Sequence, residues 1–584
     1  MCGIWSIVST DEFDEKQQHA HDLASQVCKP RGPERTNTLH FSSSQLTFHR
    51  LAINGLTSDN DQPFVYHEHD GMFHVVLCNG EIYNMRALAN MYHINLPEDA
   101  SDTQIIYPTW KALKYDFTAL QRELNGEYAL AIFTFKVNPA NPSAPTPVKA
   151  YVSTDPCSVR PVFTHIHVTD TSRKIVVSSL LGGISSLYQH GSRLPSGSTL
   201  TFDFDTGHVD LRAYVDHFPE TRPVMNGVKS LHQSIVGTLK ACVKRRMMSD
   251  RPIGCFLSGG LDSSVIAALV ARECKERGLP CYTFSIGTSL SDDVKYAEMV
   301  AKHIGSVHVT VPFDPYEAVG YLDELIRCVE TYDVTTIRAS MGQYLLSKYI
   351  AEHTDIKVVF SGDGADEEQM GYRYFNDAPS FDDAQRESCE LIHNIHLYDG
   401  LRVDRCVSVH GLEARVPYLD WEFVKLYLQI PAHVKVPNVK KGKMEKLLLR
   451  QAFEKLDPTL LPTCVMMRTK ETFSDSLSSV GEAQKVDTPD GWYGVLQSAV
   501  RERMCQADVK SEVEMWCVEW EKHAAPMHEE GMYYRYVHHK LFGGDNATVI
   551  PRCWMPKWVH VNDPSARKMN INSKEPMVLS ESPL

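Results

Sequence analysis

Between residues 253 and 360, short apolar runs alternate with segments of helical periodicity. After a helix at 228–243, strands are predicted at 253–257, 282–286, 307–311 and 357–360, with helices at 265–277 and 296–303. Parallel strands need a crossover of a dozen or more residues, which a helix supplies. The alternation, which the strand at 357–360 ends, therefore predicts an α/β domain, a doubly wound parallel sheet with helices on both faces.

The first 210 residues follow a different pattern, in which strands dominate. Strands are predicted at 75–78, 128–133 and 200–204, and we expect Asn79-Gly80 to form a turn after the first of them. The proline-rich stretch 138–148 is expected to be a loop between two strands. We predict three parts: a β-rich α+β domain over 2–210, the α/β domain with a helical extension over 211–545, and a tail over 546–584 whose end is disordered.

Composition excludes several classes of protein. The 59 basic and 73 acidic residues give a net charge of −14, which disfavours nucleic acid and anionic membranes as partners. No apolar stretch approaches the ~18 residues of a membrane span, and the start has no signal peptide. Fifteen cysteines without a C-x-x-C pair favour reduced thiols over disulfides or zinc. We expect a soluble cytoplasmic protein.

Cys2 follows the first methionine directly. Removal of Met1 would place the thiol beside a free α-amine, whose unperturbed pKa of about 7.7–8.0 lets it accept the thiol proton. Taken alone, Cys2 is more often a buried, inert thiol. Three other features of the domain favour a nucleophile: Asn79 and Gly80 could form an oxyanion hole, Arg50 could bind a carboxylate, and Asp102 could bind an α-ammonium.

Two glycine-rich segments follow strands of the predicted parallel sheet. SGGLDSS (258–264) opens a helix and can cradle a triphosphate with its backbone N–H groups, with Asp262 placed to hold Mg²⁺. SGDGADEE (361–368) follows the strand at 357–360. Because loops after parallel strands meet at one edge of the sheet, we expect the two segments to face each other.

The N-terminal segments MCGIW, KPRGPERT, HRLAI, NGEIYN and Ser101-Asp102 resemble the glutaminase domain of class II glutamine amidotransferases. The resemblance implies a four-layer α-β-β-α sandwich of the Ntn-hydrolase kind. It makes Cys2 the nucleophile and Asn79 and Gly80 the oxyanion hole. It assigns glutamine binding to Arg50, Leu51, Ala52, Ile53, Asn54, Asn79, Gly80, Glu81 and Asp102.

SGGLDSS is typical of N-type ATP pyrophosphatases. Together with ETYDVTTIRAS, LYDGLRVDR, GLEARVPYLD, GKMEKLLLR and RTKETFSD, it resembles the glutamine-hydrolysing asparagine synthetase family over nearly the whole chain. The resemblance implies ATP binding by Leu257, Ser258, Gly259, Gly260, Asp262, Ser263, Ile286, Ser361 and Gly362. It implies Mg²⁺ at Asp262 and Asp366, catalytic roles for Asp363 and Lys470, and contacts of Arg338 and Glu367 with pyrophosphate and aspartate.

The activity implied is ATP-dependent synthesis of asparagine from aspartate, with ammonia released from glutamine. It runs through β-aspartyl-AMP and gives AMP, pyrophosphate and glutamate. The substrates would be glutamine, aspartate and ATP, with Mg²⁺ as cofactor, and many relatives are homodimers.

Four segments depart from the family pattern. Pro30 and Glu34 replace the usual His and Asp, the 154–163 segment is altered, Ser179 to Leu181 replace Glu-x-Lys, and Asp363 replaces Glu. We expect the 154–163 change to affect domain contacts more than chemistry. Losing one methylene at Asp363 moves the carboxylate by ~1 Å, which can cost ~10²-fold in rate.

Two alternatives stay open. A β-lactam-forming synthetase shares the two-domain plan but usually lacks the N-terminal cysteine. A non-catalytic scaffold that keeps the fold would fit the altered 154–163 and 178–181 segments.

Overall fold

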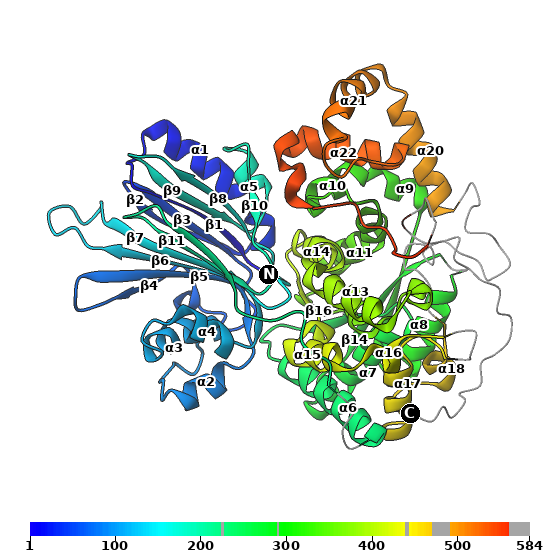
Figure 1. Cartoon of the computed structure of the whole chain (residues 1–584). Helices are drawn as coiled ribbons and strands as arrows, with labels where there is room; N and C mark the ends of the chain where they lie inside the picture. Colours follow the sequence, from blue (N-terminus) through cyan, green and yellow to red (C-terminus); the bar gives the residue numbers. More distant parts are fainter. Residues whose placement is uncertain (223–226, 289–290, 439–442, 470–490, 560–563, 565–584) are drawn as a thin grey trace.

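The structure is a computed structural model that describes residues 1–222, 227–288, 291–438, 443–469, 491–559 and 564. It consists of a β-rich N-terminal part and a larger α/β part, which lie side by side in Figure 1. The last strand of the N-terminal part, β12 (Val209–Ala213), is followed by a connection that leads to α6 (Gly227–Arg245). The predicted disordered end, 565–584, lies outside the described residues.

The N-terminal part is built from two six-stranded antiparallel sheets. In spatial order, the first sheet contains β10 (Ser192–Arg193), β8 (Phe163–Val168), β9 (Arg173–Ser178), β1 (Gly3–Ser9), β3 (Ser44–Arg50) and β2 (Arg35–Phe41). The second contains β12, β11 (Ser198–Asp203), β7 (Thr146–Thr154), β6 (Gly126–Lys136), β5 (Met72–Ile82) and β4 (Phe64–His67). The loop predicted at 138–148 connects β6 and β7, and its last residues begin β7.

Alternating apolar residues bind the two sheets together and attach helices to their outer faces. Ile4 and Val8 of β1 share one core with Val75 and Leu77 of β5. Trp5 and Ile7 face the opposite way, toward α1 (Glu15–Gln26) and α5 (Gly182–Ser185). The outer face of the second sheet packs against α2 (Met85–Met91), α3 (Ile106–Ala112) and α4 (Phe117–Glu123). The predicted α-β-β-α sandwich is confirmed.

The predicted turn at Asn79-Gly80 is wrong, because both residues lie inside β5. Gly80 pairs with Tyr128 of β6 and has a φ of +142°. A Cβ at Gly80 would lie 1.9 Å from the Glu127 carbonyl oxygen. The glycine therefore permits a close approach of two strands, and does not reverse the chain.

The second part contains a five-stranded parallel sheet. Its spatial order is β15 (Val307–Pro312), β14 (Tyr282–Gly287), β13 (Ile253–Phe256), β16 (Val358–Phe360) and β17 (Glu413–Arg415). This is the doubly wound order 3-2-1-4-5, and its direction reverses between β13 and β16. The expectation that the strand at 357–360 ends the alternation is wrong. The three-residue β17 lies beyond β16, and its sequence Glu-Ala-Arg lacks the apolar run that marks β16.

Successive residues of the central strands face opposite cores, so both faces of this sheet are covered. Ile253 and Cys255 join one core with α6, α7 (Leu261–Glu276), α8 (Asp292–Ile304), α15 (Trp421–Gln429) and α17 (Leu447–Leu456). Phe256 and Val359 join the other core, with α9 (Pro315–Gly320), α10 (Leu322–Val329), α11 (Val334–His353) and α14 (Asp399–Ser408). The helical extension adds α13 (Phe381–His393), α20 (Trp492–Met504), α21 (Ala507–Trp520) and α22 (Glu529–Phe542).

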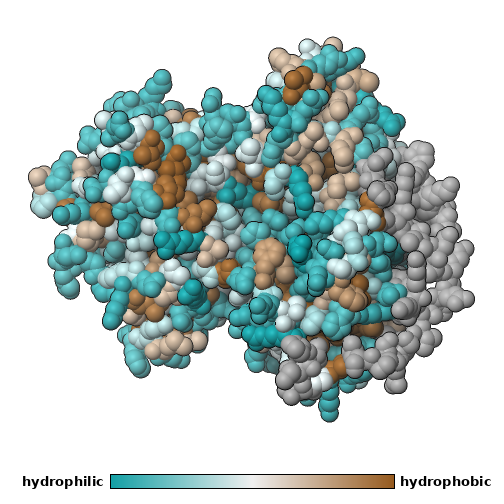
Figure 2. All heavy atoms as spheres, viewed as in Figure 1, coloured by the Kyte–Doolittle hydropathy of each residue, from teal (hydrophilic) through white to brown (hydrophobic). Residues whose placement is uncertain are grey.

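The surface agrees with the composition. The described surface visible in Figure 2 is mostly hydrophilic, with apolar residues in small groups. Within the described ranges, no helix combines the length and hydropathy needed to cross a bilayer. All fifteen cysteines are free thiols.

Candidate active sites

The first site surrounds Cys2, which directly precedes β1. The Cys2 amide donates a hydrogen bond to Asn79 Oδ1 (2.8 Å), and its thiol lies 3.6 Å from the Leu51 carbonyl oxygen. Asn79 is fully buried, and its Nδ2 has no hydrogen-bond partner among the described residues. An unpaired buried amide donor is costly, so its presence beside a thiol indicates a place for an oxygen of a ligand.

Two buried carboxyl groups and the loop after β3 complete this site. Glu81 binds the Asn54 amide, and Asp102 Oδ2 accepts the Ile82 N–H (2.5 Å). Burial raises the pKa of Asp102 to about 6, and burial together with the nearby Asp102 charge raises that of Glu81 well above its usual range. A bound cation such as an α-ammonium would favour the charged form of both groups.

Arg50 and the loop residues Leu51, Ala52, Ile53 and Asn54 lie together, as predicted from the HRLAI motif. The Arg50 guanidinium is buried and donates to carbonyls of the same loop, including Thr57 (2.8 Å), and pairs with Asp61. In this structure the Arg50 guanidinium therefore stabilises the loop, and its donors are not free to bind a ligand carboxylate. Glu34, which departs from the family pattern, accepts the Ala52 N–H (2.9 Å) and pairs with Arg251 (2.9 Å) of the other domain.

The second site lies where the loops after β13 and β16 meet. Ser258 N donates to Ser263 Oγ (3.2 Å), and Gly259 has a φ of +73°, which glycine adopts without strain. A Cβ at Gly362 would lie 2.7 Å from Ser263 N, so the two loops touch. Leu257 directly follows β13, Ile286 is the last residue but one of the neighbouring β14, and Ser361 directly follows β16. The predicted meeting of the two glycine-rich segments is confirmed.

Lys446 lies between the two aspartates predicted to bind metal. Its Nζ is 2.5 Å from Asp262 and 2.6 Å from Asp366, although Lys446 is only 3% exposed. Asp262 Oδ1 is buried without a hydrogen-bond partner among the described residues. The described part of the chain holds no group of three or more metal-ligating side chains. Two carboxylates suit Mg²⁺, which usually takes one or two of them plus phosphate oxygens.

The remaining predicted residues occupy the same edge of the sheet or its helical wall. Asp363 accepts the Ser361 hydroxyl (2.5 Å) and pairs with Arg402, and Glu367 accepts the Tyr372 hydroxyl (2.5 Å). The Arg338 guanidinium pairs with Glu530 of α22 at 2.6–2.7 Å. Lys470 lies outside the described residues.

Sequence reasoning missed several buried charges between the two sites. Arg31 donates to the Cys2 carbonyl (2.9 Å) and forms a two-pronged pair with Asp404 of α14 (2.8 and 3.0 Å). The segments GKMEKLLLR, LYDGLRVDR and GLEARVPYLD contain Lys446, Arg402, Asp404 and Arg415, to which the sequence assigned no individual role. Arg160, from the altered 154–163 segment, pairs with Glu127 (3.0 Å) and contacts the Ala414 carbonyl, which agrees with an effect on domain contacts.

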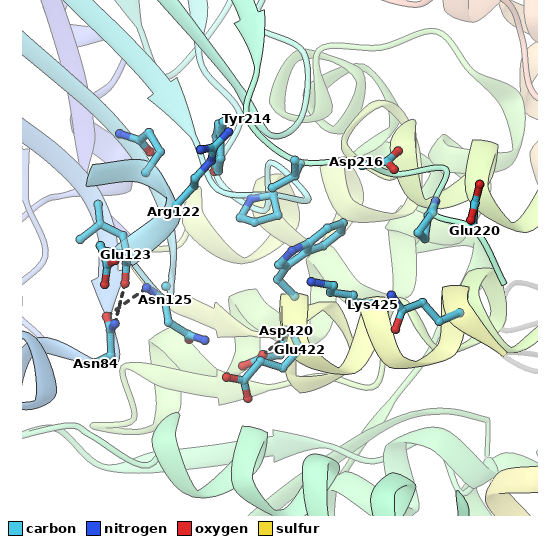
Figure 3. A pocket seen from close by; sticks show the side chains of 18 of the residues that line it. Asn84, Arg122, Glu123, Asn125, Tyr214, Asp216, Glu220, Asp420, Glu422 and Lys425 are labelled. Carbon is cyan, nitrogen blue, oxygen red and sulfur yellow. Dashed lines mark hydrogen bonds between the residues drawn. The ribbon is translucent and has the colours of Figure 1, made fainter. Parts of the chain in front are cut away.

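A cavity of about 750 Å³ also opens between the two domains. Figure 3 shows Arg122, Glu123 and Asn125 on one side of it, and Asp420, Glu422 and Lys425 on the other. None of the predicted site residues lines this cavity. It is therefore separate from both candidate active sites.

A thiol site on a four-layer sandwich, joined to a glycine-rich loop site on a doubly wound sheet, defines a two-domain amidotransferase. Family models agree: "Glutamine amidotransferase domain" matches residues 1–140, and "Asparagine synthase" matches 235–388 and 377–498. The chain is 34% identical to the glutamine-hydrolysing asparagine synthetase of Gallus gallus and 33% identical to that of Homo sapiens, over 97% of this chain and 98% of each relative. The chain belongs to the asparagine synthase family, and the predicted family and class of enzyme are confirmed.

Solved structures give weaker likenesses. A glutamine phosphoribosylpyrophosphate amidotransferase from B. subtilis aligns with 48% of this chain and 65% of its own, at 15% identity and a TM-score of 0.29. A likeness of this size supports no conclusion about function.

Proposed function

We propose that this enzyme makes asparagine from aspartate and ATP, using ammonia that its N-terminal domain releases from glutamine. The observation that carries the proposal is the buried, unpartnered Asn79 Nδ2 beside the Cys2 amide. Membership of the asparagine synthase family supports the overall reaction. The roles of individual residues are part of the proposal.

In the first half-reaction, Cys2 would act after Met1 is removed. Burial raises the pKa of the Cys2 thiol, so the thiol stays protonated and needs a base. The freed α-amine would accept the proton as sulfur attacks the glutamine amide carbon. Asn79 Nδ2 and the Gly80 N–H would stabilise the oxyanion, and collapse of the adduct would release ammonia. Water would then hydrolyse the thioester and release glutamate.

The glutamine backbone would bind at the buried charges of the same pocket. Glu81 and Asp102 offer two carboxylates to the α-ammonium, and Arg50, whose guanidinium is buried against the same loop, would bind the α-carboxylate. Because Arg50 already donates to carbonyls of the 54–57 loop, glutamine binding would require part of that loop to exchange partners.

In the second half-reaction, the aspartate side-chain carboxylate would attack the α-phosphorus of ATP and release pyrophosphate. Ser258 to Ser263, Ser361 and Gly362 would hold the phosphates, with the adenosine between Leu257 and Ile286. Asp262 and Asp366 would hold Mg²⁺, which supplies positive charge to the phosphate oxygens. Ammonia would displace AMP from β-aspartyl-AMP, and Asp363 would accept a proton there. Lys470 is proposed to neutralise charge on the phosphates.

The decisive experiment compares wild type with Cys2→Ala, with either glutamine or ammonia as nitrogen source. Cys2→Ala should lose glutamine hydrolysis and glutamine-driven synthesis but keep ammonia-driven synthesis of asparagine. Intact-mass measurement should show that Met1 is absent. A wild-type protein that forms neither AMP nor asparagine from either nitrogen source would support the scaffold alternative.

We also propose a cytoplasmic location, which the fifteen free thiols support, and a homodimer. Light scattering on the purified enzyme tests the second of these.

A further inference from the structure

Arg415 touches the predicted nucleotide loop through its main chain. It is the last residue of β17, where it pairs with Phe360 of β16. Its carbonyl oxygen accepts the Ser361 N–H (2.9 Å), so Arg415 holds the first residue of the loop 361–364. Gly362 of that loop lies against Ser263 without room for a methyl group. A shift of the Arg415 main chain would therefore move both the 361–364 loop and the 258–264 loop.

The side chain of the same residue reaches the other domain. The Arg415 guanidinium is fully buried, and its Nη2 lies 3.7 Å from Glu81 Oε2 in the glutamine pocket. Nη2 has no hydrogen-bond partner among the residues described. The rest of the guanidinium is anchored: Nε binds Glu413 (2.9 Å), and Nη1 binds the Met248 carbonyl (2.5 Å). The Nη2 group of Arg415 thus faces the glutamine pocket, while the other nitrogens of the guanidinium are held by hydrogen bonds.

A ligand with an α-ammonium would change the charge balance that Arg415 experiences. The ammonium would share Glu81 and Asp102 with a second cation 3.7 Å from Glu81. At such distances in a buried site, charges interact strongly because little solvent screens them. Any movement of Glu81 toward the ligand would alter its attraction to Nη2.

We propose that Arg415 is a positioning residue that couples the glutamine pocket to the nucleotide loop, so that bound ATP tightens the binding of glutamine and bound glutamine tightens the binding of ATP. The inference rests on the proposed function, in which Glu81 binds glutamine and Ser361 binds phosphate. Linkage requires the two effects to be equal in size.

The test uses the full-length Cys2→Ala enzyme, which should bind glutamine without hydrolysing it. The dissociation constant of glutamine is measured by calorimetry with and without saturating MgATP. We expect ATP to tighten glutamine binding at least about fivefold, the lower end of ordinary allosteric coupling. In Cys2→Ala/Arg415→Lys the ratio of the two glutamine dissociation constants, without and with MgATP, should fall below about twofold. A lysine ammonium cannot bind Glu413 and the Met248 carbonyl and also reach Glu81, as the arginine guanidinium does.

Arg160→Lys in the same background is the matched control. Arg160 is also a fully buried interface arginine and contacts Ala414 of the same strand, but its ion-pair partner is Glu127 instead of Glu81. It should keep the fivefold ratio. Glu413→Gln, which weakens the anchor at Nε, should lower the ratio too, and it replaces Arg415→Lys if that variant does not fold.

The outcomes separate the two proposals. A ratio near one in Cys2→Ala, a preserved ratio in Arg415→Lys or Glu413→Gln, or an equal loss in Arg160→Lys would each overturn the coupling role. Continued glutamine hydrolysis by Cys2→Ala would instead overturn the proposed function.

Discussion

Replacing Asn79 tests whether its unpaired amide stabilises the reaction. Asn79→Asp keeps an oxygen that can accept the Cys2 N–H, now 2.8 Å from Oδ1, but removes the Nδ2 donor. Asn79→Ala removes both groups. Loss of one oxyanion donor typically lowers kcat by ~10²–10³, or about 2.7–4 kcal/mol. Because Nδ2 is buried and makes no compensating hydrogen bond in the described structure, we expect the full effect in both variants.

The assay measures glutamate release at saturating glutamine and, separately, ammonia-driven synthesis of asparagine. The first rate should fall at least about a hundredfold in both Asn79 variants, whereas the second should stay within about twofold of wild type. If Asn79→Asp hydrolyses glutamine at nearly the wild-type rate while Asn79→Ala does not, Asn79 only positions the Cys2 main chain, and the oxyanion role is wrong.

Three further predictions concern charge and packing. Burial raises the pKa of Asp102 to about 6, and Asp102 must be ionised to bind an α-ammonium, so below pH 6 kcat/KM for glutamine should fall about tenfold per pH unit more steeply than protonation of the α-amine alone predicts. A slope that does not steepen between pH 6 and pH 5 would contradict this role of Asp102. Gly80→Ala should lower the free energy of unfolding in urea by about 3 kcal/mol or more, because its methyl group would overlap the Glu127 carbonyl; a loss under about 1 kcal/mol would contradict this close approach. Asp404→Ala should lower the free energy of unfolding by about 3–5 kcal/mol, because it leaves the buried Arg31 without its carboxylate partner. Asp210→Ala, which breaks an exposed ion pair with Arg212, should lower it by under about 1 kcal/mol. Equal losses in the two variants would contradict the role of burial.

The altered segments gain a physical interpretation from the structure. Glu34 bridges the Ala52 amide and Arg251 across the domains, so the change from Asp keeps an acidic group in a contact between domains. At the end of the 178–181 segment, the main-chain amides of Leu181 and of the following Gly182 donate to Glu330 of the other domain (2.9 and 2.8 Å). Glu34 and Leu181 therefore take part in contacts between the domains, which favours an effect on assembly over a direct effect on chemistry.

Local sequence patterns were sufficient to predict the parallel sheet and the two glycine-rich loops. Both signals are local: helical periodicity and a glycine-rich turn depend on residues that are neighbours along the chain. The segments MCGIW, HRLAI and NGEIYN likewise predicted residues that the structure places in contact with Cys2, namely Leu51 and Asn79, but they did not predict the hydrogen bonds of Arg50. The helix and strand order then fixed the meeting point of Ser263 and Gly362, because parallel topology brings the ends of successive strands to one edge.

The other features of the sites depend on contacts between segments that lie far apart in the sequence. Asn79-Gly80 has the composition of a turn, but β6 lies so close that Gly80 is needed inside a strand. Lys446 meets Asp262 across 184 residues of sequence, and Arg415 meets Glu81 across more than three hundred. No local pattern carries such contacts, because a buried charge is stable only where another segment supplies its partner, and the packing of the two domains determines which segment that is.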